Sequence, residues 1–451
     1  MGFSSTQVLF LGFLAVILLG ALLLMLPAAT APGEETSFLT ALFTSTTSIC
    51  VTGLVVVDTF SHWSLFGKAV ILVLIQLGGF GVVTFYSIFV LALRKRFSLK
   101  LTTLVRDYYN LDSMQGLLLF LKKVIKGTLA VEGIGAILYA FTFIPRFGPI
   151  KGLGVSIFNS VSAFCNAGMD IIGPDSLIGY QDNLAVNWIT MSLIVVGGLG
   201  YVVWFDCFRN AEKVRKQKLK PIRLFTGLSE HTKLVLGITL FLILSGALLI
   251  FIFERKNPET LGGMDSGGKL LASLFQSITF RTAGFATIPQ QSLSEESCVL
   301  GLVYMFIGGS PVGTAGGVKT VTVFIIFANM LAYMANRREA VVFGRGISQQ
   351  MVNKASAIVT ASLGAALLLT ILLAHFSRVP MLDAAYEIFS ATATVGLSRG
   401  LTPTLNSAGK IIVIIGMYLG RLGPISMGLL FAENQPSKNG VHFADGHFFI
   451  G

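Results

Sequence analysis

Long apolar runs alternate with short polar segments along the whole chain. Eight runs are long enough to span a membrane, at about 8–29, 65–93, 118–144, 184–208, 233–253, 298–332, 355–376 and 409–432. A helix needs about 20 apolar residues to cross the hydrocarbon core of a bilayer. Because the runs are continuous and do not alternate with period two, they favour membrane helices over a β-barrel. The pattern predicts an all-α polytopic membrane protein.

A shorter apolar segment lies inside each successive pair of runs. These segments are found at about 36–49, 152–165, 268–280 and 381–393, and each is followed by a turn that contains glycine. A segment of that length is too short to span, so between two spans it is a candidate re-entrant helix. Its non-helical end is tolerated at membrane depth only where it lines a wet cavity or is buried in protein.

Two glycine markers recur with the same period. The turn glycines Gly53, Gly168, Gly284 and Gly396 are 115, 116 and 112 residues apart. A second set of glycines within the following runs, at 78, 197, 308 and 420, is spaced by 119, 111 and 112 residues. A period near one quarter of the chain predicts four copies of one unit. We place the repeats at 1–94, 95–209, 210–337 and 338–433, followed by a cytosolic tail at 434–451.

The basic residues predict the topology. The loops that join one unit to the next carry 20 of the 33 Lys and Arg residues, which is typical of cytoplasmic loops. The short segments therefore enter from outside, and an even number of spans leaves both termini in the cytoplasm. All units point the same way, so the predicted fold is four parallel helix–re-entrant pore helix–helix repeats around a pseudo-fourfold pore.

Composition excludes several other functions. The chain is 53% hydrophobic and 12% charged, and its net charge of +11 lies in short loops, which argues against nucleic-acid binding. The four cysteines and five histidines form no metal or disulfide pattern. No catalytic or nucleotide-binding motif is present, so we expect neither an enzyme nor a cofactor in this chain.

Four such turns meeting on one axis are suited to hold a dehydrated cation. A filter needs backbone carbonyls that point inward, and glycine permits the positive φ angles that aim successive carbonyls the same way. Ordinary turn glycines are the alternative, but four in register favour a filter. The predicted filter residues, whose carbonyls would bind the cation, are Val51, Thr52, Gly53, Asn166, Ala167, Gly168, Thr282, Ala283, Gly284, Thr394, Val395 and Gly396.

These features resemble the Ktr/Trk/HKT superfamily of cation uptake proteins, most closely its bacterial Ktr pore subunits. Besides the turns, the resemblance rests on a Phe-x-Ser-x-Ser/Thr motif at 43–47 and 158–162, from which the third and fourth units diverge. In this superfamily the filter glycines are associated with K+ selectivity, and members with serine at the first tend to pass Na+. Gly53 thus implies K+ uptake across the plasma membrane. The absence of a strict TVGYG filter implies weaker selectivity than in a dedicated K+ channel.

One long run is interrupted by a glycine-rich stretch. The residues concerned are Gly308, Gly309, Ser310, Pro311, Gly313, Thr314, Ala315, Gly316 and Gly317, which cannot continue a helix. Because we see this interruption in one unit alone, we expect it to obstruct the pore, and the resemblance implies an intramembrane gating loop. A kink that serves only packing is the alternative. Arg421 is costly at mid-span, and we expect it to hold the loop by its carbonyls or to repel cations. A structural bridge to a carboxylate is its alternative role.

The resemblance also implies partners. It implies a homodimer of pore chains and a cytosolic, nucleotide-binding, KtrA-like ring subunit, and it leaves open Na+ as an activator. Membrane lipid surrounds such a chain. A K+/Na+ or K+/H+ coupled symporter is the alternative function, although Glu132 and Asp206 are isolated acids to which we assign no transport role. Asp170, just beyond the second turn, is a candidate for concentrating cations at the outer mouth.

Overall fold

The computed structural model describes residues 5–81 and 117–423, which are predominantly helical. Four long helices come first in each of four successive groups: α1 (Ser5–Leu24), α6 (Leu117–Phe147), α11 (Glu230–Glu254) and α15 (Gln349–Ser377). Four short helices follow them: α2 (Phe38–Cys50), α7 (Pro149–Cys165), α12 (Ser266–Phe280) and α16 (Met381–Thr392). They lie where the apolar pattern predicts short helices.

A third set of helices completes each group. It consists of α3 (Leu65–Phe80), α8 (Leu184–Leu199) with α9 (Tyr201–Lys216), α13 (Glu295–Phe306) with α14 (Thr320–Met334), and α17 (Ser407–Leu422). The connections contain α10 (Arg223–Thr226), a hairpin of β1 (Val341–Val342) and β2 (Arg345–Gly346), and four short 3-10 turns, η1 (Pro27–Ala29), η2 (Ile178–Tyr180), η3 (Gln290–Ser292) and η4 (Thr402–Thr404).

Polar caps explain where the helices of the third set begin. The Ser64 and Ser294 hydroxyls and the Asn183 and Asn406 side-chain oxygens accept backbone N–H groups in the first turns of α3, α13, α8 and α17, respectively. Each cap satisfies a donor that the helix itself cannot pair. The apolar runs therefore become helices with defined starts just beyond the turns that precede them.

The third set of helices is broken more often than the sequence predicts. Helix α8 ends at Leu199 and α9 starts at Tyr201 with a bend of 96° at Gly200, where φ is +90°. A loop at 307–319 separates α13 from α14. Helices α3 and α17 end at Phe80 and Leu422, and the glycine after each, Gly81 or Gly423, also has positive φ, while the chain beyond lies outside the described residues. The prediction of an interruption in one unit alone was wrong, because a single glycine suffices to turn the backbone out of the helix.

These breaks also reduce the number of long spans. Within 5–81 and 117–423, three helices are long and apolar enough to cross a membrane, with the bent pair α8–α9 as a fourth candidate. The three are Phe120–Phe147, Glu230–Glu254 and Gln349–Ser377. The expectation of an uninterrupted span is thus wrong for the run at 184–208, whereas the interruption predicted within 298–332 is confirmed. The ends of the runs at 65–93 and 409–432 lie outside the described residues.

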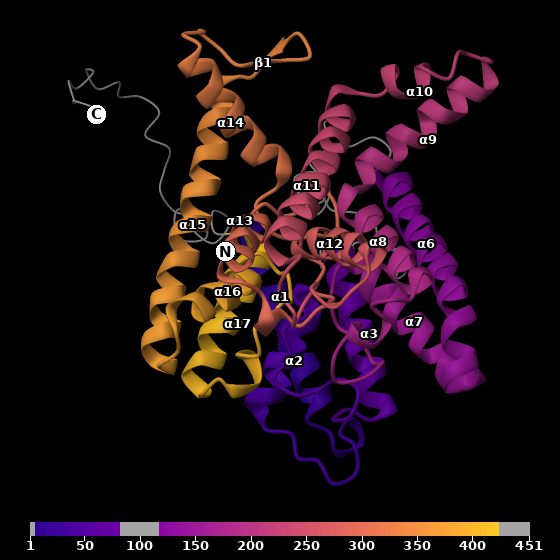
Figure 1. Ribbon diagram of the computed structural model, residues 1–451, viewed down its shortest axis with the longest axis vertical. Helices are drawn as coiled ribbons and strands as arrows, with labels where there is room; N and C mark the ends of the chain where they lie inside the picture. Colours follow the sequence, from indigo (N-terminus) through magenta and orange to yellow (C-terminus); the bar gives the residue numbers. More distant parts are fainter. Residues whose placement is uncertain (1–4, 82–116, 424–451) are drawn as a thin grey trace.

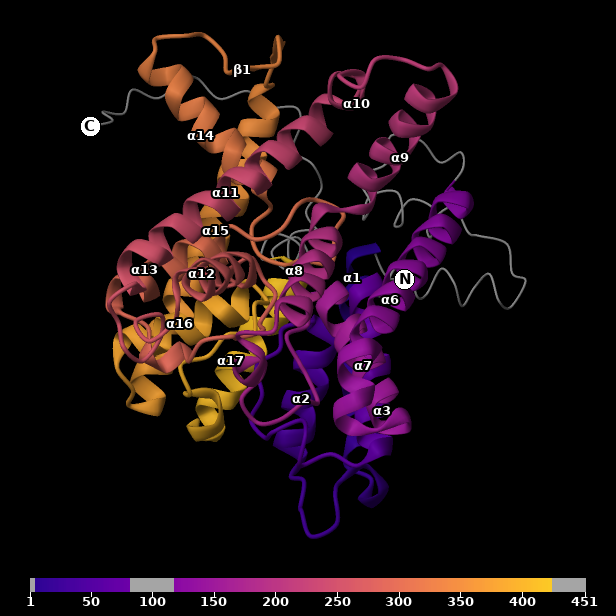
Figure 2. The same cartoon turned by 45° about the vertical axis from the view of Figure 1, so that its right-hand side comes forward.

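The groups pack around a common centre. Figures 1 and 2 show α1 to α3, α6 to α8, α11 to α13 and α15 to α17 arranged about the middle of the molecule. The connection that contains α10 and the β1–β2 hairpin project from one end, while the loops next to α2 and α3 lie at the opposite end. The tail at 434–451 lies outside the described residues, as do the basic residues at 94–106.

Candidate functional site: a ring of four turns between two cavities

The turns after the four short helices share one backbone conformation. Positive φ occurs at Val51, Asn166, Thr282 and Thr394, and again two residues later at Gly53, Gly168, Gly284 and Gly396. Non-glycine residues seldom adopt positive φ, so its recurrence at four matched positions marks a conformation held by its surroundings. An alternation of this kind is what aims successive carbonyls toward one side.

The turns touch one another in a closed ring. A Cβ atom added to Gly53 would overlap the Ala167 carbonyl oxygen, and one added to Gly396 would overlap that of Thr52. A Cβ on Gly168 would lie 2.8 Å from the Ala283 carbonyl oxygen, and one on Gly284 would lie 2.5 Å from that of Val395. Each turn therefore contacts the next one in chain order, and the fourth turn contacts the first. The structure thus brings the twelve predicted filter residues together.

Hydroxyl groups of the short helices hold three of the turns. The Thr47 hydroxyl accepts the Gly53 N–H at 2.9 Å, and the Ser390 hydroxyl accepts the Gly396 N–H at 3.0 Å. In the second turn the Ser162 hydroxyl accepts the Met169 N–H at 3.1 Å. The third turn differs, because the Thr279 hydroxyl donates to the Phe285 carbonyl at 2.6 Å.

The third unit keeps a motif that the sequence spacing had indicated only for the first two. Residues 275–279 again place phenylalanine, serine and threonine at the same intervals, one residue closer to the turn glycine. Ser277 donates to the Ile243 carbonyl at 2.8 Å, as Ser45 does to Ile17 and Ser160 to Glu132, both at 2.6 Å. The prediction that the third unit diverges was wrong. The one-residue offset hid the match.

Replacing Thr47 by valine tests this bracing. The Gly53 N–H would lose its partner in a buried site, and we expect the free energy of unfolding to fall by about 1–3 kcal/mol. Thr46→Val is the matched control, because the Thr46 hydroxyl only donates back to Leu42 within its own helix. Thermal unfolding of the two purified variants checks the difference. Equal loss in both variants would contradict the assigned role of Thr47.

A cavity opens on one side of the ring, and we name it the outer cavity after the predicted topology. Its volume is about 260 Å³, and all four turn glycines line it. Asp58 and Asp170 also line it, and the Asp170 carboxylate accepts the Ile172 N–H at 3.2 Å. Burial raises the pKa of Asp170 to about 6, against hydrogen bonds that lower it. The cavity therefore presents acidic groups to whatever enters it.

An inner cavity of about 470 Å³ lies next to the 307–319 loop. Phe306, Gly316 and Lys319 line one part of it, and Thr392 and Ala393 at the base of the fourth turn line another. The Gly316 N–H donates to the Thr282 hydroxyl at 3.2 Å, and a Cβ on Gly316 would overlap the Thr394 hydroxyl. The loop thus lies directly against the third and fourth turns and forms part of the wall of this cavity.

Helices of the second group hold the other side of this loop. The Ser310 and Thr314 N–H groups donate to the Gly198 and Gly197 carbonyls at 3.0 and 3.2 Å. The Tyr201 N–H donates to the Val312 carbonyl at 3.1 Å. The break at Gly200 therefore exposes carbonyl and N–H groups that the loop uses, which gives the Gly197–Gly198 pair a role beyond helix packing.

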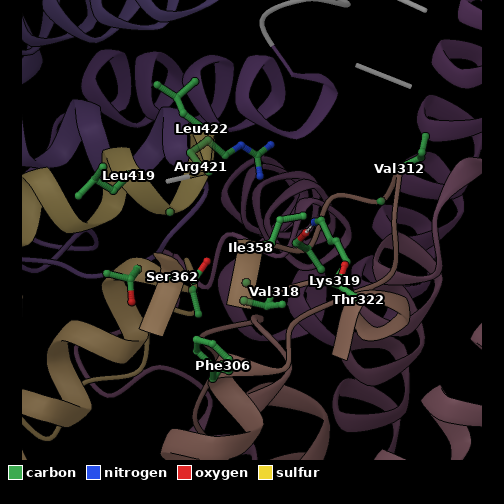
Figure 3. A pocket seen from close by; sticks show the side chains of 18 of the residues that line it. Phe306, Val312, Val318, Lys319, Thr322, Ile358, Ser362, Leu419, Arg421 and Leu422 are labelled. Atoms are coloured by element: carbon green, nitrogen blue, oxygen red, sulfur yellow. Dashed lines mark hydrogen bonds between the residues drawn. The ribbon is translucent and has the colours of Figure 1, made fainter. Parts of the chain in front are cut away.

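Arg421 reaches into the inner cavity from the end of α17, and Figure 3 shows its guanidinium pointing into the space near Lys319. Its Nη1 donates to the Thr314 carbonyl in the loop at 3.1 Å, and its Nη2 donates to the Gly78 carbonyl. Lys319 donates to the Ala315 carbonyl at 2.7 Å. Within the described residues the partners of Arg421 are carbonyls and not a carboxylate, so it links the loop to the first and fourth groups.

The two isolated acids have structural partners. Glu132 is 4% exposed and accepts the Gln76 amide at 3.0 Å, with the Cys165 thiol at 3.7 Å. Asp206 lies beyond the bend at Gly200 and accepts the Ser229 N–H at 2.9 Å, just before α11. Glu132 therefore joins three helices behind the second turn, and Asp206 stabilises the start of the next helix.

A polar network behind the fourth turn was not predicted from the sequence. Glu387 is fully buried on α16 and accepts the hydroxyls of Ser398, at 2.7 Å, and Thr402. Tyr386 donates to Gln290 at 3.0 Å, and Gln290 exchanges hydrogen bonds with Gln276 on α12. A carboxylate inside an apolar segment is itself an unusual signal and could have identified Glu387.

Comparisons with known proteins agree on one family. The sequence matches the TrkH family, described as cation transport protein, over residues 5–443. It is 38% identical to the Ktr system potassium uptake protein B of Bacillus subtilis, over 100% of this chain and 97% of that protein. It is 35% identical to the potassium/sodium uptake protein NtpJ of Enterococcus hirae, over 97% and 95% of the two chains.

A solved structure shows the same fold. The potassium transporter TrkH from Vibrio parahaemolyticus superposes with a TM-score of 0.75 at 18% identity, covering 94% of this chain and 84% of that one. The predicted resemblance to cation uptake proteins is confirmed, and the family is one of transporters and not of enzymes. By its match over most of its length, the chain belongs to the TrkH family of cation transport proteins.

Proposed function

We propose that the chain is the membrane subunit of a K+ uptake system of the Ktr type and conducts K+ through a gated pore on the axis of the four turns. The observation that carries this proposal is the closed ring of glycine turns between an outer and an inner cavity. The relatives named for potassium uptake support K+ as the transported ion.

The twelve turn residues serve as the selectivity filter in this account. Buried hydroxyls accept the backbone N–H groups of Gly53 and Gly396, and this bracing lets the turn carbonyls replace the water around K+ without having to reorganise. The four short helices act as re-entrant pore helices, and the four repeats at 1–94, 95–209, 210–337 and 338–433 surround the axis. The four turns differ from one another in sequence and lack a strict TVGYG motif, which supports weaker selectivity than in a dedicated K+ channel.

The 308–317 stretch serves as the gate, with Arg421 as its latch. The loop lies against the turns and lines the inner cavity, so in this account cations that leave the filter toward this cavity pass it. Arg421 holds the loop and also places a positive charge in the path. Opening requires the loop to leave these carbonyl contacts.

The assembly follows from the same resemblance. We propose a homodimer in the plasma membrane, with both termini cytoplasmic, regulated by a KtrA-like nucleotide-binding ring and with Na+ as a candidate activator. The connection that contains α10 and the β1–β2 hairpin support this, because they project from one end and carry basic residues such as Lys220, Arg223 and Arg345. That end offers the regulatory ring a docking surface.

Flux measurements on the purified chain in liposomes test the function. We expect K+ uptake that runs down the electrochemical gradient, exceeds Na+ uptake and shows no fixed stoichiometry with a second ion. K+ accumulation that depends on a Na+ or H+ gradient, with a constant ratio of ions, would instead establish the coupled symporter. Equal flux with and without the protein would overturn both.

External pH gives a further prediction through Asp170. Its raised pKa of about 6 means that the carboxylate is charged at pH 7 and becomes neutral as the pH falls below that value. Asp58 is the other acid that lines the cavity and acts on Asp170. When Asp170 becomes neutral, the cavity loses one negative charge, which lowers the local cation concentration. We expect K+ uptake at low K+ concentration to fall as external pH is lowered through about 6.

Two variants check the origin of this pH dependence. Asp170→Asn should show reduced uptake at pH 7 and little further change down to the same acidic pH. The exposed Asp182 is the matched control, and Asp182→Asn should keep the wild-type profile. An unchanged pH profile in Asp170→Asn would assign the effect to another group.

A further inference from the structure

Arg281 is a buried cation that neither the filter nor the gate uses. It directly precedes Thr282 of the third turn, and its side chain is 7% exposed. Its Nε has no hydrogen-bond partner, and no ion pair joins the guanidinium to any residue within 5–81 and 117–423. A buried charge without a partner is strongly unfavourable, so an acceptor or a negative charge near Arg281 would stabilise the site.

Arg281 lines a small space between helices. This cavity of about 10 Å³ lies among α8, α11 and α12, with aliphatic side chains of α8 and α12 along its walls. Gly309 of the gate loop and Gly198 next to the α8–α9 break close one side. A space of this size holds about one water-sized particle. Sulfate, phosphate and carboxylate ions are therefore too large.

A second unpartnered group lines the same space. The Thr239 hydroxyl on α11 is 5% exposed and also has no hydrogen-bond partner. Guanidinium N–H groups can only donate, and the threonine hydroxyl can donate as well. Two donors, one of them positively charged, therefore line a space with room for a single acceptor. Water would satisfy the hydrogen bonds, but only an anion would also neutralise the charge.

We propose that this cavity binds one small monovalent anion of the halide class, held by Arg281 and Thr239. In a cation pore such an ion would offset a positive charge that otherwise repels the transported cations. The Arg281 charge lies behind the third turn, and Thr282 accepts the Gly316 N–H of the gate loop. The bound anion shields cations in the filter from this charge and packs against Gly309, where the gate loop begins.

Bromide and chloride are the probes that test this site. Crystals of the full chain grown in bromide should show anomalous density between Arg281 and Thr239. Independently, the purified chain in detergent should unfold at a temperature higher by about 2 °C or more in chloride than in gluconate at equal ionic strength. Arg281→Gln and the near-isosteric Thr239→Val should both lose this difference.

A matched control separates the site from a general effect of salt. Thr370 is another buried threonine on a long helix, and its hydroxyl donates to the Ala366 carbonyl, so Thr370→Val should keep the chloride dependence. The proposal is overturned if no bromide density appears at the site. It is equally overturned if chloride and gluconate give the same unfolding temperature in the wild-type chain, since the site then holds water or an adventitious ion only. Because these readouts do not depend on flux, they stand apart from the proposed transport function.

Discussion

Gly53→Ser should lower the preference for K+ over Na+ by about tenfold or more, which corresponds to about 1.4 kcal/mol. Gly53 has φ of +98°, where a side chain is strained, and any Cβ would overlap the Ala167 carbonyl oxygen of the next turn. The first and second turns must then move apart. A wider ring coordinates K+ less well and no longer excludes hydrated Na+.

The measurement is the ratio of K+ to Na+ flux in liposomes that contain wild-type or variant protein. Gly33→Ser is the matched control, because Gly33 has a similar φ of +90° but a Cβ at that position would have no neighbouring atom within 4 Å. It should leave the ratio unchanged. If Gly53→Ser also keeps the wild-type ratio, the first turn does not set selectivity.

Arg421→Gln should raise K+ flux by about tenfold. The substitution removes the positive charge from the inner cavity and the charged donor to the Thr314 carbonyl. A hydrogen bond from a charged group contributes about 1.5–3 kcal/mol, and about 1.4 kcal/mol is enough to change a closed-to-open ratio tenfold. The loop should therefore leave its closed position more often.

Initial rates of K+ flux in liposomes check this result, with Lys410→Gln as the control. Lys410 lies near the start of the same helix, α17, and takes no part in the contacts of the gate loop. Lys410→Gln removes one positive charge yet should leave flux near the wild-type level. Unchanged or lower flux in Arg421→Gln would mean that the loop does not gate the pore through this residue.

Much of the helical layout is visible in the sequence because it depends on local patterns. The apolar runs, the short segments between them and the turn glycines each have a fixed chemical meaning at membrane depth. The sequence also predicted that the partners of Arg421 include backbone carbonyls of the glycine-rich loop. A buried arginine needs acceptors, and a glycine-rich loop supplies free carbonyls.

What the sequence hid depends on contacts between distant residues. Glycines within an apolar run can serve close helix packing or mark a bend, and the sequence alone does not distinguish the two. The bend at Gly200 becomes clear only when Gly197, Gly198 and Tyr201 are seen to form hydrogen bonds with the gate loop. The hydroxyl motif of the third unit was missed because one residue fewer separates Ser277 from its turn glycine. The small cavity beside Arg281 is formed by three helices and is invisible in any one segment.

The central claim is that cations bind on the axis of the four turns, and Rb+ or Tl+ anomalous diffraction tests it most directly. Crystals of the full chain soaked in either ion should show density between the carbonyl groups of residues 51–53, 166–168, 282–284 and 394–396. The density should weaken in Gly53→Ser. Ordered Rb+ or Tl+ elsewhere among the helices, with none between the turns, would contradict the account.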